Sequence, residues 1–306
     1  EEFPGRKFHK YIDMNTVFLK ADSLIAPIKS IKFDKERNLW EKYENKYIDN
    51  NINSLNNFTL LTYNVWFDRH NYINRRSALL EILKKKSASV ICLQEVIQPF
   101  MDFLQEDEFI KENYYISDSL LDSYNIVMLS KMPLRFYHLT FPTNQKRYLV
   151  IGEIKIKSQI TSKSLVFSTS HFESLDNNAD FRKDQMSRTF KVINEFKNSF
   201  LTGDFNIDDK LNKQELNNFD GLYTDSWKFW MQKKNLKEED GYTYYEDNQW
   251  PKMRLDRILY GNYSDFELKN FEIIGKEKIK VDSNAKGNSV ATPSDHQGLF
   301  AEFYRK

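Results

Sequence analysis

From Phe58 to the end of the chain, short apolar runs alternate with polar segments, and this rhythm restricts the folds that the chain can adopt. Runs of strand length include FTLLTYNV, VICLQEV, SYNIVMLSK and SLVFSTSHF. Segments between them carry apolar residues at helical spacing, as in NRRSALLEILKKKSAS, or begin with proline, as in PFMDFLQEDEFIKE. Many short strands with interspersed helices predict an α/β or α+β fold.

Residues 1–57 have a different character. The stretch IKFDKERNLWEKY predicts two short strands joined by a polar turn, and the Asn-rich stretch IDNNINSLNN predicts a connecting loop. This region has too few apolar positions to build a core of its own. We therefore predict that residues 1–57 form an N-terminal extension packed on a main domain of residues 58–306.

Composition excludes several classes of protein. The apolar runs are too short to cross a bilayer, and the first residues, EEFPGRKFHK, lack the apolar core of a signal peptide. The single cysteine, Cys92, excludes an internal disulfide framework and favours a reducing compartment. We therefore expect a soluble protein without a membrane partner, and an intracellular one.

The charge balance bears on nucleic-acid binding. With 45 basic and 44 acidic residues, the net charge is only +1. Proteins that hold long duplexes by charge alone are far more basic, so a nucleic acid would be bound at a local site. Aromatic residues make up 15% of the chain, which leaves some available to stack on bases beside the core.

Polar side chains end one apolar run after another. In chain order they are Asn64, Glu95, His171, Ser174, Asp204, Asn206, Asp256, Asp295 and His296. Buried strands can deliver such side chains to one shared edge of a sheet. Gathering four carboxylates there is unfavourable unless a cation, a histidine or an arginine offsets their repulsion.

Each motif also has a structural interpretation. LQE could end in a solvated glutamate, GDFN could form an Asx-type turn, TSH could hold a core histidine, and SDH could be a turn whose aspartate caps backbone amides. Single motifs of this kind are common. The presence of all of them, in this order, argues against coincidence.

At these residues the chain resembles the endonuclease/exonuclease/phosphatase superfamily of metal-dependent phosphodiesterases, over about residues 58–304. The motifs TYNV, LQEV, TSHFES, GDFN, LDRILY and SDH carry the resemblance, and TSHFES, MRLDRILY and PSDHQGL look most like its tyrosyl-DNA phosphodiesterase 2 branch. The resemblance implies a four-layer αββα sandwich with two central, mostly antiparallel sheets. It also implies Mg²⁺ at one mouth of the sandwich, with Mn²⁺ as a substitute.

Phosphodiester hydrolysis requires an activated water and neutralisation of charge on the phosphate. Mg²⁺ prefers oxygen ligands, so Glu95 is the expected metal ligand, with Asn64 beside it and Asp295 as a weaker outer candidate. Asp204 is expected to orient and deprotonate the attacking water. Asn206 is expected to donate hydrogen bonds to the phosphate or to hold that water.

Two histidines are expected to stabilise the charge that develops on the phosphoryl oxygens. His296 would act from one side, with its tautomer fixed by Asp256, and His171 from the other. The resemblance also implies a hydrogen bond from Ser174 to a phosphate oxygen.

The sequence departs from the pattern of the branch at Trp66, where many relatives carry an acidic residue, and this favours a single Mg²⁺ centred on Glu95. Trp66 is expected to pack in the fold or to line the substrate groove. Tyr244, where relatives often place a tryptophan, is a candidate platform for a base, and Tyr124 is a similar candidate. Arg257 either reaches the substrate or ties down a loop.

The resemblance implies hydrolysis of a 5′-phosphotyrosyl linkage on DNA ends by a monomer, leaving a 5′-phosphate, as in DNA repair, and a nuclear location if the source is eukaryotic. A phenol leaves more easily than an alcohol, which suits a site without a dedicated general acid. The alternatives are an RNA exonuclease or deadenylase, an endonuclease, a phosphoinositide phosphatase, or a non-catalytic interaction module.

Overall fold

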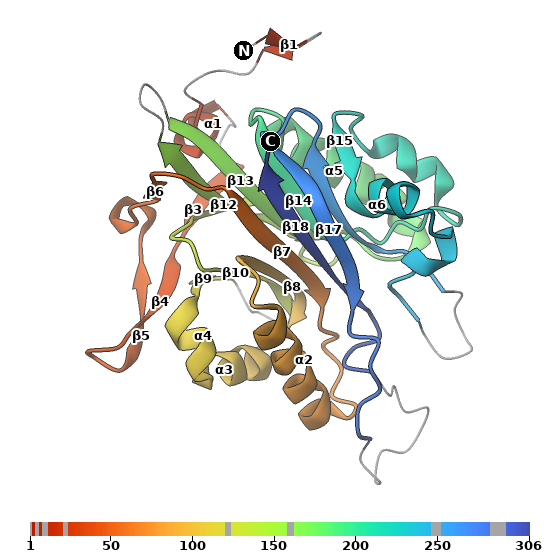
Figure 1. Cartoon of the computed structure of the whole chain (residues 1–306), viewed down its shortest axis with the longest axis horizontal. Coiled ribbons are helices and arrows are strands. Elements are labelled where there is room, and N and C mark those ends of the chain that lie inside the picture. Colours follow the sequence, from red (N-terminus) through yellow and green to blue (C-terminus); the bar gives the residue numbers. More distant parts are fainter. Residues whose placement is uncertain are drawn as a thin grey trace.

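Two β-sheets packed face to face form the centre of the computed structural model of the chain (Figure 1). The structure describes residues 2–3, 6–7, 12–20, 24–119, 124–157, 162–245, 252–281 and 292–306. Helices cover the outer face of each sheet, so the predicted four-layer αββα sandwich is confirmed.

The first sheet has eight strands and is antiparallel except for the pair β7–β8. Its strand order is β17 (Phe266–Ile274), β18 (Gly298–Arg305), β7 (Asn57–Asn64), β8 (Val90–Val96), β10 (Asn125–Ser130), β9 (Tyr115–Ser117), β4 (Ser30–Asp34) and β5 (Leu39–Tyr43).

The second sheet is antiparallel except where β14 joins β13 and where the short strand β6 (Asn51–Ile52) joins β12. Its strand order is β15 (Tyr223–Asp225), β16 (Asp256–Gly261), β14 (Asn198–Asp204), β13 (Ser162–His171), β12 (Tyr148–Lys157), β11 (Arg135–Thr140) and β3 (Ile25–Ile28). A separate pair, β1 (Glu2–Phe3) and β2 (Arg6–Lys7), precedes both sheets.

The helices divide between the two sheets. The first sheet carries α2 (Tyr72–Lys86), α3 (Gln98–Glu106) and α4 (Glu108–Asn113), and the second carries α1 (Met14–Lys20) and α5 (Ala179–Ile193). The helix α6 (Ser226–Lys234) packs against β15 and β16 of the second sheet and β17 of the first, where Trp227 contacts Phe271. Short 3₁₀ helices are η1 (Asn45–Tyr47), η2 (Asp176–Asn178), η3 (Lys213–Asn218) and η4 (Glu238–Gly241). None of the helices in the described residues is long and apolar enough to span a membrane.

One predicted helix is in fact two. The segment predicted as a single helix, PFMDFLQEDEFIKE, breaks at Asp107, whose backbone is extended. Its carboxylate accepts hydrogen bonds from the N–H groups of Phe109 and Ile110, which caps the start of α4. An aspartate in this role competes with the continuing helix for the same backbone donors.

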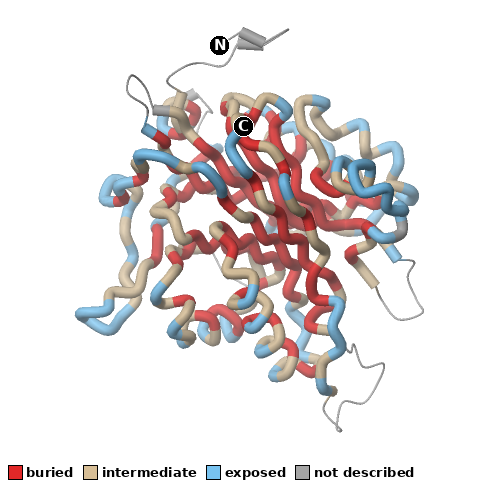
Figure 2. The backbone as a smooth tube through the Cα atoms, in the orientation of Figure 1, coloured by how far each residue is buried: buried red, intermediate tan, exposed pale blue. Residues whose placement is uncertain are grey.

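Three apolar clusters separate the four layers, and Figure 2 shows the buried residues running along both sheets. Between the sheets, Phe58 contacts Phe167, Phe200 and Phe303 with ring centroids 5.1, 5.0 and 5.4 Å apart. Cys92 lies in this cluster, 1% exposed, as a buried thiol. These rigid layers fix the strand ends that carry the polar residues.

The N-terminal region contributes strands to both sheets. The predicted hairpin is present as β4 and β5, and β4 pairs with β9 at the edge of the first sheet. Just before it, β3 pairs with β11 at the edge of the second sheet. Residues 1, 4–5, 8–11 and 21–23 of the predicted extension lie outside the described residues.

Strand register brings the predicted polar residues to one mouth of the sandwich. In the second sheet, His171 lies opposite Asp204, and Asp204 lies opposite Asp256. In the first sheet, the parallel pairing of β7 and β8 places Asn64 beside Gln94.

Candidate active site

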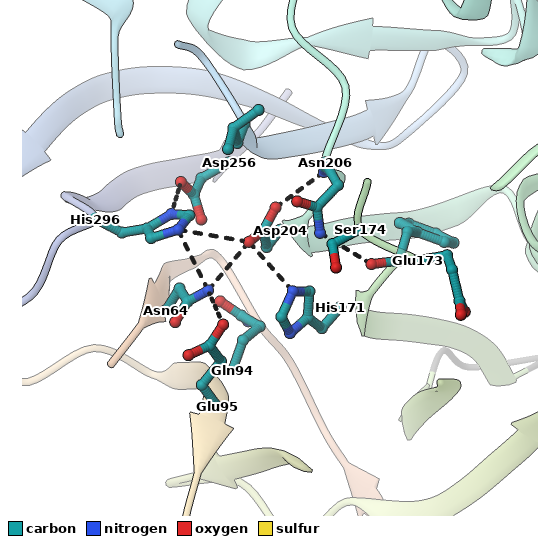
Figure 3. Close-up of polar contacts among 12 residues, drawn as sticks. Asn64, Gln94, Glu95, His171, Glu173, Ser174, Asp204, Asn206, Asp256 and His296 are labelled. Atoms are coloured by element: carbon teal, nitrogen blue, oxygen red, sulfur yellow. Dashed lines mark hydrogen bonds and ion pairs between the residues drawn. The ribbon is translucent and has the colours of Figure 1, made fainter. Parts of the chain in front are cut away.

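Asp204 lies at the centre of a hydrogen-bonded cluster at this mouth (Figure 3). Its Oδ2 atom lies 3.0 Å from Asn64 Nδ2, 3.4 Å from His171 Nε2 and 3.7 Å from His296 Nε2. Asn64 comes from the first sheet and His171 from the second, so the cluster joins the two sheets. Asp204 is 1% exposed, which makes these contacts strong.

His296 is the charged imidazole of the cluster. Its Nδ1 atom lies 2.8 Å from Asp256 Oδ2, and Asp256 is buried at the start of β16. Burial alone would lower the pKa of His296, but Asp256, Asp204 and Asp295 raise it well above the usual value. Burial raises the pKa of Asp256 to about 6, against the opposing effect of His296. We therefore assign an imidazolium held between carboxylates.

His171 is the neutral imidazole. Its Nδ1 atom lies 2.9 Å from Arg147 Nη1, and because a guanidinium can only donate, Nδ1 is the acceptor. The ring proton is then on Nε2, which faces Asp204. Burial and the charge of Arg147 hold the pKa of His171 well below its usual value. The two histidines thus differ in charge because the Nδ1 atom of His171 faces a guanidinium and that of His296 faces a carboxylate.

Asp204 is ionised in this environment. Burial by itself raises the pKa of its carboxyl group, but the two imidazoles and the hydrogen bonds from Asn206 N and Asn64 Nδ2 bring the pKa below the usual value. The Asn206 N–H donates to Asp204 Oδ1 at 2.9 Å. A buried carboxylate that stays charged can hold a water by its remaining lone pairs.

Glu95 enters the site through a bulge in β8. The register of β8 and β10 shifts so that Gln94 and Glu95 both lie opposite Ile126. Glu95 has φ 60°, and the bulge turns its carboxylate towards the mouth. Its two oxygens accept hydrogen bonds from Asn64 Nδ2 at 3.2 Å and from Phe67 N at 3.1 Å.

Asp295 lies near Glu95 and raises the negative charge of this part of the site. Ser294 Oγ donates to Asp295 Oδ1 at 3.2 Å. Burial raises the pKa of Asp295 to about 6, and the nearby charge of Glu95 adds to this effect. Burial also raises the pKa of Glu95, with His296 opposing it.

Two matching turns aim Asn64 and Asp204 at each other. The N–H of Trp66 donates to Asn64 Oδ1 at 3.1 Å, as that of Asn206 does to Asp204. Trp66 and Asn206 have φ 57° and 51°. Each turn stops its strand and fixes the polar side chain that ends it.

A group that could hold a metal ion consists of Asp204, Asp256 and His296, whose ligand atoms lie within 4.8 Å of one another. Contacts within the protein already account for this proximity, because His296 is hydrogen-bonded to Asp256 at 2.8 Å and forms an ion pair with Asp204 at 3.7 Å. A protonated imidazole has no lone pair to offer a metal. The oxygen atoms of Glu95 and Asp295 suit a hard cation better.

Other predicted residues line the cluster. Ser174 Oγ donates to Gln145 Oε1 at 2.9 Å. Gln145 thus accepts the hydrogen bond that Ser174 was expected to donate to a phosphate oxygen. Asn206 Nδ2 donates to Phe172 O at 3.0 Å. The ring of Tyr244 lies 5.0 Å from that of His296, edge to face.

The predicted aromatic residues differ in their surroundings. Trp66 packs under Arg75, whose guanidinium lies 4.3 Å from its ring centroid, and Trp66 is half-buried. Tyr124 stacks on Phe67 with ring centroids 4.6 Å apart and an interplanar angle of 6°. Phe67 is 43% exposed, so this stack is accessible beside Glu95.

Of the two roles expected for Arg257, its contacts fit the one that ties down a loop and not the one that reaches the substrate. Its guanidinium is 1% exposed and bonds to Asp225 Oδ2 at 3.0 Å, Asp209 Oδ1 at 3.1 Å and Ile207 O at 2.7 Å. Arg254 joins the same carboxylates. Along β16, side chains alternate between the two faces, so Arg257 points away from the face of Asp256.

Sequence analysis missed Arg147 and Phe67. Arg147 directly precedes β12 and donates to His171. A charged residue at the start of an apolar run was the signal that could have indicated a site residue. Phe67 follows Trp66 in an apolar run, and nothing in that run distinguishes an exposed ring from a core one.

The fold and the site together define a class of protein: αββα sandwiches that gather carboxylates, amides and two imidazoles at one mouth. The family described as "Endonuclease/Exonuclease/phosphatase family" matches residues 61–296, and the chain belongs to this family.

Similar proteins include "Tyrosyl-DNA phosphodiesterase 2" of Gallus gallus, 27% identical over 263 residues, which cover 80% of this chain and 66% of that protein. The protein of the same name from Homo sapiens is 27% identical over 266 residues, covering 79% and 67%. A "5'-tyrosyl-DNA phosphodiesterase" of Caenorhabditis briggsae is 24% identical over 258 residues, covering 80% and 69%. The chain spans 66% of the length of the Gallus gallus protein, just under two thirds.

Solved structures share the fold. That of D. rerio TDP2 complexed with single strand DNA product has a TM-score of 0.65 at 21% identity and covers 81% of this chain and 98% of that one. Truncated Caenorhabditis elegans TDP2 has a TM-score of 0.63 at 20% identity, covering 81% and 97%. The human Nocturnin catalytic domain has a TM-score of 0.55 at 12% identity, covering 82% and 94%.

Proposed function

We propose that the chain is a Mg²⁺-dependent phosphodiesterase that hydrolyses a 5′-phosphotyrosyl–DNA linkage and leaves a 5′-phosphate. The observation that carries the proposal is the placement of one charged and one neutral imidazole around the ionised Asp204, within reach of Glu95. The names of the relatives support the linkage, and the family supports the class of reaction.

The carboxylates of Glu95 and Asp295 fit a hard divalent cation. Glu95 and Asp295 are half-buried and repel each other. No arginine or lysine is hydrogen-bonded to either carboxylate within the described part of the chain, although the charge of Arg75 acts on Asp295. A cation held by Glu95, with Asp295 as an outer partner, would offset that repulsion. Mg²⁺ bound there would neutralise charge on a phosphoryl oxygen. Trp66 contributes no carboxylate, which favours a single metal.

The chain's own residues perform the remaining steps. Asp204 orients a water and accepts its proton as the new bond to phosphorus forms. His296 donates from Nε2 to a phosphoryl oxygen, and Asp256 keeps its other nitrogen protonated and in place. His171 carries its proton on Nε2, on the opposite side of Asp204, and donates from there. Phosphoryl transfer depends largely on such positioning and charge neutralisation.

The leaving group can be a phenol. His296 and His171 are assigned here to the phosphoryl oxygens, so no separate general acid is assigned to the leaving oxygen, and a phenolate leaves with little proton assistance. The accessible stack of Phe67 on Tyr124, together with Tyr244, would hold bases of a strand next to the phosphate. With a net charge of +1, binding rests on this local site. A monomer acting on DNA ends in repair would meet these requirements.

The test is an assay of the purified chain with Mg²⁺ on a 5′-phosphotyrosyl oligodeoxynucleotide. We expect release of tyrosine and a 5′-phosphorylated strand, and loss of that activity in Glu95→Gln. The conservative substitution Glu106→Gln, at an exposed residue at the end of α3, serves as control. Poly(A) and an inositol phosphate are assayed in parallel. Robust cleavage of either, with no release of tyrosine, would overturn the linkage that we propose.

A further inference from the structure

Leu175 follows Ser174 at the rim of the site and combines two properties that leucines seldom share. Its side chain is 65% exposed. Its backbone has φ 74° and ψ 144°. When residues other than glycine adopt a positive φ, they mostly do so with ψ of about 30–60°. Leu175 lies well outside that region, in a part of the map that glycine nearly monopolises, so its backbone is strained.

Hydrogen bonds to three consecutive carbonyl oxygens impose this conformation from inside the protein. Arg182, 1% exposed, donates from Nη1 to Glu173 O at 3.0 Å and to Leu175 O at 2.7 Å. Asn178 donates from Nδ2 to Ser174 O at 2.7 Å and from its backbone N–H to Leu175 O at 3.1 Å. Glycine would accept the same bonds without strain. The backbone therefore does not explain the leucine.

Burial does not explain the leucine either, because most of its side chain is in water and gains little from the apolar core. The segment that carries it is part of the site. Phe172 O accepts from Asn206 Nδ2, and Ser174 bonds to Gln145. Figure 3 shows Ser174 beside Asn206. A leucine at this position is therefore exposed next to the site, where it can contact a bound substrate.

A second exposed leucine lies on a neighbouring loop. Leu211, 60% exposed, donates its N–H to Asp208 Oδ1 at 3.0 Å. Asn212 Nδ2 donates to Asp176 Oδ1 at 3.3 Å, which ties this loop to that of Leu175. Asp176 is exposed. Lys210, which precedes Leu211, forms an ion pair with Glu238 at 3.6 Å and bonds to Tyr242 OH at 3.4 Å. Beside Leu175 itself, the exposed carboxylate of Asp176 disfavours a phosphate and the apolar side chain favours an uncharged ring.

We propose that Leu175 is a substrate-contact residue whose side chain packs on an uncharged ring next to the scissile phosphate, and that the strained leucine is retained for this contact. The ring belongs to a nucleobase or to an aryl leaving group, and the span of two leucine-bearing loops favours the nucleobase. The inference rests on the proposed function, because it requires a phosphodiester bound at Asp204.

Leu175→Gly tests the contact, because it removes the side chain and the strain together. We expect Tm to rise by roughly 1–4 °C. With the p-nitrophenyl ester of thymidine 5′-phosphate, we expect KM to rise about 5–20-fold at unchanged kcat. A merely structural leucine would give the opposite sign in Tm. Leu39→Gly is the matched control, since Leu39 is 44% exposed in β5; there Tm should fall and KM should stay unchanged.

An abasic version of the same ester identifies the ring. If Leu175→Gly no longer raises KM on it, the ring is the nucleobase, and if the rise persists, the ring is the aryl group. An unchanged KM on both esters overturns the inference while the proposed function stands. If the wild type turns over neither ester, the proposed function fails, and the contact fails with it.

Discussion

Left-handed backbone at three residues aims the side chains of the site. Trp66, Glu95 and Asn206 have φ 57°, 60° and 51°, and none is glycine. Each such residue costs of order 1–3 kcal/mol, so the surrounding structure must hold it. The N–H groups of Trp66 and Asn206 each donate to a side-chain oxygen two residues earlier, which holds the backbone in place. At Glu95 the β-bulge between β8 and β10 holds it. Simple strand alternation does not predict these directions.

Asp256 acts through His296, so its amide variant should impair turnover more than binding. Asp256→Asn presents either an N–H or a carbonyl to Nδ1 and no longer stabilises the imidazolium. We expect kcat to fall about 10²–10⁴-fold with little change in KM on an aryl phosphodiester. Glu272→Gln, which removes an ion pair with Lys86 on the surface, is the control. An unchanged kcat would show that Asp256 is not required for turnover.

Glu153 should make stability depend on pH, away from the site. It is 1% exposed and accepts hydrogen bonds from Met14 N at 3.1 Å and Ser164 Oγ at 2.6 Å. Burial nevertheless raises its pKa above the usual value. The unfolded chain therefore loses this proton first, and stability is lost as pH rises from about 4 through the folded pKa.

The comparison that isolates this effect is wild type against Glu153→Gln. We expect the Tm of the wild type, relative to that of the variant, to be highest near pH 4 and to decline towards pH 7, because glutamine has no proton to lose. Thermal unfolding from pH 4 to pH 8 measures it. A relative Tm that is flat or increases with pH would contradict the assignment.

At the scale of elements, the parallel pairing of β13 with β14 sets the distance between His171 and Asp204. This pairing depends on Gly203, which has φ 130°. A Cβ there would lie 1.9 Å from Ser170 O on the neighbouring strand. Only glycine allows the two strands to approach this closely next to His171 and Asp204.

Gly203→Ala should therefore disturb both stability and the site. We expect a loss of about 2–4 kcal/mol in the free energy of unfolding and a fall in kcat, since Asp204 is adjacent. Denaturant unfolding measures the first and turnover the second. Gly221→Ala is the control, because a Cβ at Gly221 meets nothing within 4 Å. Equal effects of the two substitutions would be inconsistent with the close approach.

A buried ion-pair cluster joins the loop after β14 to the start of α6. Asp225 caps α6 and binds Arg254 and Arg257, which also bind Asp209. Arg257→Met leaves the partly buried carboxylates of Asp225 and Asp209 each short of one partner, so we expect a loss of about 1.5–3 kcal/mol in stability. KM measured well below Tm should not change. A wild-type Tm with a raised KM would indicate instead that Arg257 contacts the substrate.

At the scale of the molecule, the motifs predicted the sandwich and the convergence of strand ends. The sequence marks where strands end, and the resemblance supplies how they pair. The pairing of His296 with Asp256 was expected, but the neutral state of His171 was not predictable, since it depends on Arg147, which is distant in sequence and near in space. The sequence left two roles open for Arg257, because both partners of its ion pairs lie on other elements.

The edges of the sheets were less predictable than the centre. β11, β17 and α6 were not expected, and their sequences mix polar and apolar residues because each lies near a surface. The strands β3 and β4 join opposite sheets although only Lys29 separates them. Such a crossing depends on where the two sheets end, which is a property of the whole fold.

The central claim is that Glu95 of the first sheet and Asp204 of the second act on one phosphate. The most direct test is the rate of tyrosine release from a 5′-phosphotyrosyl oligonucleotide by Glu95→Gln, by Asp204→Asn and by the double variant. We predict that each single substitution lowers the rate at least about 10³-fold and that the double variant is at most about 10-fold slower than either, because residues that act as a unit are not additive. Losses that multiply in full, or a single variant that keeps the wild-type rate, would contradict a shared site.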